Sequence, residues 1–366
     1  MNSSDVISYK LLGFDADAYF SLQKEQIKKR VKKFAHGRLY LEVGGKLLFD
    51  PHASRVLPGF DPEVKKKLFK ELADSADFIY CVDAKSITEN RQLKNTSETY
   101  QEVTMAMIQS LHQEIGKAPF IAINLCEHTP QPEVKKYAHE LKQLGYETFF
   151  RYIIPGYPHD TKVVLSDKGY GQDEYIPVKK KLVIVTGAAS NSGKMSTCLG
   201  QIYHDTKRGL ESGYAKYETF PIWNLPLNHP VNLAYEAATV DIGDYNMYDT
   251  FHMNYYKETS VNYNRDVAAF EILLMLGREM LSEQNPTRQY HSPTDMGINY
   301  AGFAITNDEA ISIASLQEIR RRKVWYTEII ERGQGSEKWL ADCDTLEKKA
   351  LEYIASKKYD LSKKLT

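Results

Sequence analysis

The chain has little excess charge and few cysteines. Its 366 residues carry a formal net charge of -1, so its surface offers no general attraction to nucleic acids or membranes. The four cysteines are widely spaced and form no CxxC pair, which argues against a disulfide framework or a zinc ribbon. We therefore predict a cytoplasmic protein that binds neither nucleic acid nor membrane.

Long apolar runs and metal-binding motifs are also missing. No stretch approaches the roughly 20 apolar residues that a membrane helix needs. The start of the chain, "MNSSDVISYKLLGFD", lacks the basic leader and apolar run of a secretory signal. No HExxH motif occurs, which excludes the common zinc protease pattern. We assign no residue as a resident metal ligand.

The first half of the chain alternates strand-like and helix-like patterns. Helical spacing of apolar residues predicts helices between the strands. This alternation predicts an α/β fold with a mostly parallel sheet covered by helices, whose ligands bind at the edge where the strands end. The predicted strands are "RLYLEV", "DFIYCVD", "PFIAINL", "ETFFRYI", "KLVIVTG" and "YAKYETFPIW".

The pattern changes after Pro226. Apolar positions at helical spacing predict helices that begin near Val267, near Asn307 and near Glu337. We therefore predict an α/β phosphate- or nucleotide-binding domain over residues 1–226 and a mainly helical domain or insertion over residues 227–366. Within the first domain, "TKVVLSDKGYG" is rich in turn residues and predicts a short hairpin.

The segment "VTGAASNSGKMST" is typical of a P-loop-like strand–loop–helix. Small residues after a buried strand let backbone N–H groups approach an anion, and Lys194 opens a helix whose N-terminus attracts negative charge. The candidate ligand-binding residues are Gly187, Ser190, Asn191, Ser192, Gly193, Lys194, Ser196 and Thr197.

Two departures separate this segment from a standard P-loop. Five residues lie between Gly187 and Gly193, whereas the standard loop has four. Met195 stands where a Ser or Thr hydroxyl should bind Mg²⁺.

Asp83 and Glu127 follow predicted strands and are the candidates to position a metal ion, although acids at strand ends also cap helices. ATP or another nucleotide, with Mg²⁺, is the cofactor that this segment suggests.

Several longer stretches are recognisable together. They are "LYLEVGGKLLFDPHASRVLPGF", "SGKMSTCLGQIYHDTKRG", "AKYETFPIWNLPLNHPVNLAYEAATVDIGD", "ETSVNYNRDV" and "HSPTDMGINYAGFAI". From roughly Asp15 to Lys323 the chain resembles the uncharacterised bacterial family DUF1846, also called UPF0371. The family shares the Gly-Lys-Met order, so the resemblance implies that Met195 is a family trait and favours a specialised phosphate site over a standard NTPase. Family members are usually longer and end in another α/β domain.

Two other polar clusters are candidates for chemistry. "FDPHASRVLPGF" follows a predicted strand; in it His52 can act as an acid or a base, and Arg55 can pair with a phosphate or a carboxylate. "YHSPTDMG" offers His291 in front of a helix or turn. Both clusters can equally serve to satisfy backbone groups. We take His52, Arg55 and Asp83 as the catalytic candidates.

Three functional hypotheses follow. The first is an enzyme that binds a nucleotide or phosphorylated metabolite at Lys194 for phosphoryl transfer or ATP-dependent ligation. The second is a non-catalytic sensor or scaffold for a phosphate-bearing ligand. The third is a metal-free hydrolase or transferase that uses His52 or His291. The expected partner is a small phosphorylated ligand, and a homo-oligomer is an open alternative.

Overall fold

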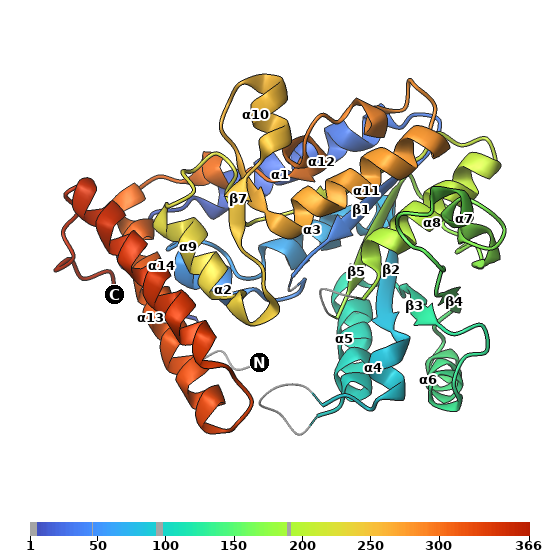
Figure 1. Cartoon of the computed structure of the whole chain (residues 1–366), viewed down its shortest axis with the longest axis horizontal. Coiled ribbons are helices and arrows are strands. Elements are labelled where there is room, and N and C mark those ends of the chain that lie inside the picture. The colour runs from blue at the N-terminus through green and yellow to red at the C-terminus, as the bar shows by residue number, and fades with distance from the viewer. Residues whose placement is uncertain (1–5, 46, 93–97, 189–191) are drawn as a thin grey trace.

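The computed structural model describes residues 6–45, 47–92, 98–188 and 192–366 (Figure 1). Its centre is a seven-stranded sheet in which every paired neighbour is parallel. This confirms the predicted α/β class and the parallel sheet. In order across the sheet, the strands are β4 (Thr148–Tyr152), β3 (Phe120–Cys126), β2 (Ala76–Asp83), β5 (Leu182–Gly187), β1 (Leu39–Val43), β6 (Gly213–Tyr217) and β9 (Gly297–Ile298).

Helices cover both faces of the sheet, which is why its strands are continuous apolar runs. On one face, Leu41 and Ile184 share a core with Phe69 and Leu111 from the covering helices. That layer contains α1 (Ala16–Lys33), α3 (Val64–Leu72), α4 (Ala84–Thr88), α5 (Tyr100–Ile115) and α6 (Pro132–Gln143). The opposite face is covered by α7 (Thr161–Val164), α8 (Lys194–Lys207) and α11 (Asn264–Met280).

A second apolar core lies beside the sheet and joins both ends of the chain. Phe14 and Val56 share it with Ile319 and Leu346. Figure 1 shows its two long C-terminal helices lying side by side, in red. The helices of this group are α2 (Pro51–Val56), α9 (Pro230–Ala237), α13 (Asp308–Glu331) and α14 (Glu337–Ser356).

The segment after residue 226 is not helical throughout. β7 (Asn246–Tyr248) and β8 (Val261–Tyr263) form an antiparallel ribbon, and β9 adds an edge strand to the main sheet. The division of the chain at residue 226 stays a prediction. Short helices complete the chain: α10 (Thr250–Tyr256), α12 (Pro293–Met296) and the 3-10 turns η2 (Ala73–Ser75), η3 (Tyr170–Gln172), η4 (Val240–Ile242), η5 (Pro286–Gln289) and η6 (Ala301–Ala304).

The hairpin predicted for "TKVVLSDKGYG" is wrong. The segment instead forms α7 and η3. The side chain of Asp160 accepts a hydrogen bond from the N–H of Val163 at 3.1 Å, so an N-cap starts a helix where the turn residues suggested a hairpin. Across the described residues, no helix is both long and apolar enough to cross a membrane.

Candidate functional site

A cleft of about 720 Å³ opens where β1 and β6 end. The carboxyl edge of a parallel sheet is the usual ligand position in such folds, and this volume is typical of small-molecule sites. Its lining residues come from many elements and include Glu42 (β1), His52 (α2), Lys194 (α8), Lys216 (β6), Asp266 (α11) and Arg322 (α13).

Part of the predicted phosphate-binding segment reaches this cleft. Gly193, Lys194 and Ser196 are among its lining residues. Lys194 is the first residue of α8 and is 5% exposed. The N-cap is Gly193, whose φ of 79° lies in the left-handed region, and glycine has no side chain to cap the first-turn amides. The first-turn amide groups of α8 and Lys194 therefore lie at the same end of the helix, next to the cleft.

The other predicted loop residues lie behind the cleft or outside the described chain. Thr197 is fully buried and its hydroxyl donates to Oδ1 of Asn124 at 3.0 Å, while Nδ2 of Asn124 donates to the carbonyl of Ser192 at 2.7 Å. A Cβ on Gly187 would lie 2.4 Å from Oγ of Ser192, so only glycine allows this close approach. Ser190 and Asn191 lie outside the described residues, and the phosphate-loop interpretation of this segment stays a prediction.

Neither acidic candidate lines the cleft. The carboxylate of Asp83 caps α4 by accepting from the N–H groups of Lys85 at 3.2 Å and Ser86 at 3.1 Å. Glu127 is exposed beyond the end of β3. Among the described residues, no group of three or more His, Cys, Asp or Glu is placed to hold a metal ion.

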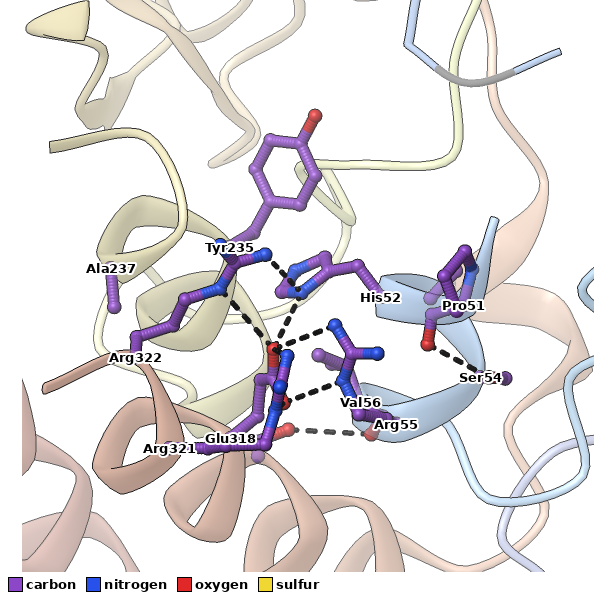
Figure 2. Close-up of polar contacts among 12 residues, drawn as sticks. Pro51, His52, Ser54, Arg55, Val56, Tyr235, Ala237, Glu318, Arg321 and Arg322 are labelled. Carbon is purple, nitrogen blue, oxygen red and sulfur yellow. Dashed lines mark hydrogen bonds and ion pairs between the residues drawn. The ribbon is translucent and has the colours of Figure 1, made fainter. Parts of the chain in front are cut away.

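His52 lines the cleft and belongs to a buried ionic cluster around Glu318 (Figure 2). Its Nδ1 lies 2.9 Å from Oε1 of Glu318. Arg55, from the same helix, places its Nε 2.9 Å from Oε2 of Glu318, and Arg321 and Arg322 also pair with this carboxylate. Arg55 thus pairs with a carboxylate, the second of its two predicted options, and it does not line the cleft.

The cluster shifts the pKa of both partners. Burial alone would raise the pKa of Glu318, but hydrogen bonds from His52, Arg321 and Arg55 hold it well below its usual range. For His52, burial lowers the pKa and outweighs the opposing hydrogen bond to Glu318. His52 is therefore a neutral imidazole near neutral pH, beside an ionised carboxylate.

The cleft holds a second ionic cluster, whose members the sequence analysis did not bring together. Lys216 places its Nζ 3.0 Å from Oε1 of Glu218 and also pairs with Asp266. Glu42 stands opposite Lys216 in the register of β1 and β6, and its Oε2 accepts from the hydroxyl of Tyr214 at 2.7 Å. Three carboxyl groups thus surround one lysine. The available signal was the alternation of Tyr214, Lys216 and Glu218, which places charge on one face of a strand.

Within this cluster, the pKa values of Glu218 and Asp266 shift in opposite directions. Burial and the neighbouring charge of Asp266 raise the pKa of Glu218 well above its ordinary value, which Lys216 only partly opposes. Burial also acts to raise the pKa of Asp266, but Lys216 outweighs it and the net shift is downward. Oδ2 of Asp266 is buried and accepts no hydrogen bond from a donor among the described residues. Of the two carboxyl groups, Glu218 is the one whose pKa is raised.

His291 lies apart from the cleft. Its ring stacks on Tyr255 with centroids 3.7 Å apart, and its backbone N–H donates to Oδ2 of Asp295 at 2.8 Å. It is not among the cleft-lining residues. Of the two histidines considered for catalysis, the fold brings only His52 together with Lys194.

Comparison with known proteins finds one family. A family model described as "Domain of unknown function DUF1846, N-terminal" matches residues 12–350, beyond the residue 323 at which the resemblance was expected to end. UPF0371 proteins of Streptococcus pneumoniae serotype 2 strain D39 and of strain R6 are each 42% identical over 314 residues. These alignments cover 86% of this chain and 62% of each relative. The chain therefore spans less than two thirds of the length of these relatives.

Proposed function

The chain belongs to the DUF1846 family, whose description assigns no reaction, and we propose that it binds a phosphate-bearing ligand in the cleft beside Lys194. The observation that carries this proposal is the position of Lys194. It is both the first residue of α8 and part of the cleft wall. A helix N-terminus and an ammonium attract the same phosphate, and their effects add.

The ligand we favour is a nucleotide or a phosphorylated metabolite. Its phosphate would lie at Gly193 and Lys194, and the rest of the ligand would extend along the sheet edge toward Lys216. β1 lies between β5 and β6, so these two strands are about 10 Å apart. Tyr157, Tyr217 and Tyr235 add aromatic surface to the cleft wall, against which a sugar or a base can pack.

Phosphoryl transfer or ATP-dependent ligation is the first reaction class to test. If Mg²⁺ takes part, Ser196 offers it a hydroxyl, because this residue is among the described residues that line the cleft, whereas the hydroxyl of Thr197 is occupied by Asn124. A sensor or scaffold would bind the same ligand without turnover. Measuring ATP consumption with and without Mg²⁺ separates the two possibilities.

Calorimetry on Lys194→Met tests the binding proposal. The probes are inorganic phosphate, sugar phosphates, and ATP with and without Mg²⁺. Loss of charge-assisted hydrogen bonds worth about 1.5–3 kcal/mol lowers affinity by about 10- to 100-fold. Methionine keeps most of the aliphatic stem, so packing is largely preserved. The matched control is Lys136→Met on α6, whose side chain is 79% exposed and outside the cleft.

The proposal requires that at least one of these phosphate compounds binds the wild type. It also requires that Lys136→Met binds like the wild type while Lys194→Met does not. Equal affinity in the two variants, or no binding by any probe, would overturn it.

A further inference from the structure

We propose that His52 and Glu218 form an acid–base pair in the cleft, in which His52 accepts a proton and Glu218 donates one. This inference rests on the proposed function, because the ligand on which the pair acts is the one anchored at Lys194. Both side chains line the same cleft as Lys194. They come from α2 and from the end of β6, which the fold places at the same sheet edge.

The tautomer of His52 follows from its contact with Glu318. Two acceptor atoms cannot face each other at 2.9 Å, so Nδ1 must carry a proton and donate it to Oε1 of Glu318. Nε2 then holds the lone pair, and it is buried without a hydrogen-bond partner among the described residues. A carboxylate that orients an imidazole in this way is the arrangement of a general base.

The surroundings of His52 keep the ring neutral. Burial opposes protonation, as does the guanidinium of Arg322, whose Nη2 lies 3.4 Å from Nδ1, while Glu318 and Asp50 favour it. The rings of Tyr235 and Phe220 lie 5.6 and 6.2 Å from the imidazole and give it an aromatic wall. Figure 2 shows His52 between Tyr235 and Glu318. Burial dominates, so the imidazole is ready to accept a proton.

Glu218 is the acid of the proposed pair. Its side chain is 8% exposed, and it shares one lysine with Asp266. Lys216 is shared by Glu218 and Asp266, and burial and the charge of Asp266 raise the pKa of Glu218, which favours a proton on this side chain. Environments that move two titratable groups in opposite directions identify the acid and the base of a site. By this criterion His52 is the base and Glu218 is the acid.

The chemistry that this pair supports is transfer from a phosphate-bearing donor to water or an alcohol. The acceptor O–H bond breaks and its proton moves to Nε2 of His52. The acceptor oxygen bonds to the reacting phosphorus or carbon atom. The bond from that atom to the leaving oxygen breaks, and this oxygen takes the proton of Glu218. No oxidant or reductant is required, and exchange with solvent restores both side chains.

Nitrogen-15 NMR tests the assignment of the base without any substrate. At about pH 7 the His52 ring should be neutral and protonated at Nδ1. Glu318→Gln should change this tautomer balance or lower the pKa of His52, because the carboxylate that favours protonation is gone while Arg322, which opposes it, remains. A wild-type ring that is protonated at Nε2, or charged, would overturn the proposal.

Turnover assays test the pair itself. Phosphorus-31 NMR follows wild-type protein with a set of nucleotides, nucleotide sugars and sugar phosphates, with water or glycerol as acceptor. His52→Gln and Glu218→Gln should each lower turnover by about 10²- to 10⁴-fold and keep the affinity for inorganic phosphate. The wild-type rate should follow a bell-shaped pH profile that loses its acid limb in His52→Gln. The exposed residues His139 and Glu133, changed to Gln, are the matched controls.

The outcomes separate the two proposals. If phosphate binds through Lys194 but the wild type turns over no compound in the set, the acid–base pair is rejected and the binding function stands. Wild-type rates in either variant also reject the pair. If no phosphate compound binds, both proposals fail together.

Discussion

The Nδ1 atom of His52 lies 2.9 Å from Oε1 of Glu318, although 266 residues separate them in the chain. This contact joins α2 to the middle of α13. The wall of the cleft that carries His52 therefore depends on a C-terminal helix. A substitution that displaces α13 should therefore also disturb the position of His52, because Glu318 holds its ring.

We expect Glu318→Gln to destabilise the protein strongly. Its carboxylate is 1% exposed and is shared by Arg55, Arg321, Arg322 and His52. Removing one partner from a buried ionic cluster leaves the others uncompensated and costs about 3–5 kcal/mol. Urea denaturation measures this change. The control is Glu347→Gln, which loses pairs with the partly exposed Arg320 and Lys323 and should cost at most about 1 kcal/mol. Similar losses in both variants would contradict the prediction.

The Glu318 contribution should also depend on pH in a defined direction. Its pKa in the folded protein is below the unfolded value of about 4.3. The unfolded chain therefore binds a proton first as pH falls, and the stabilisation is lost on the acid side. The difference in unfolding free energy between wild type and Glu318→Gln should be constant above about pH 6 and shrink below about pH 4.3. A difference that grows on acidification would refute this sign.

Glu218→Gln should show the opposite behaviour and stabilise the protein at neutral pH. The pKa of Glu218 is raised in the folded protein, chiefly by burial and by Asp266. The folded state then holds a proton that the unfolded chain has released, so wild-type stability falls as pH rises above about 4.3 toward the folded pKa. Gln cannot ionise and avoids this cost. Thermal melts of both proteins should show a difference in Tm, in favour of Glu218→Gln, that increases as the pH rises above about 4.3.

The companion variant Asp266→Asn controls for the loss of any carboxyl group from this cluster. Asp266 is the ionised partner of Lys216, so its removal leaves a buried ammonium without its main counter-charge and should destabilise the protein. Stabilisation by both variants, or by neither, would mean that the proton is not on Glu218.

The sequence was sufficient for six of the seven strands of the main sheet, all except the edge strand β9, and insufficient for the cleft. "KLVIVTG" and "DFIYCVD" are apolar on both faces because helices cover both faces, and that pattern is local. The cluster of Glu42, Lys216 and Asp266 is not local. It forms only when β1, β6 and the start of α11 meet, and no spacing rule connects these positions.

Acidic residues at the ends of strands show a second limit of prediction from the sequence. Asp83 ends β2 and Asp50 follows β1, and each caps the next helix. Asp50 nevertheless lines the cleft, where Lys65 is 3.0 Å away, whereas Asp83 does not. Which of two capping acids lies at the cleft is decided by the order of strands in the sheet. β1 lies between β5 and β6, while β2 lies on the other side of β5, and only the structure gives that order.

The last prediction concerns Gly193, where space and backbone conformation act together. A Cβ at this position would lie 2.9 Å from Cβ of Asn124, in addition to the strain of a φ of 79°. Asn124 links Ser192 to Thr197, so Gly193→Ala should displace this side chain, lower stability by about 2–4 kcal/mol and weaken phosphate binding. Gly209→Ala is the matched control, because Gly209 has a φ of 75° and nothing within 4 Å of its Cβ position. Denaturation and phosphate titration of both variants isolate the contact with Asn124. Equal stability losses, with phosphate affinity unchanged in Gly193→Ala, would show that Asn124 does not support the start of α8.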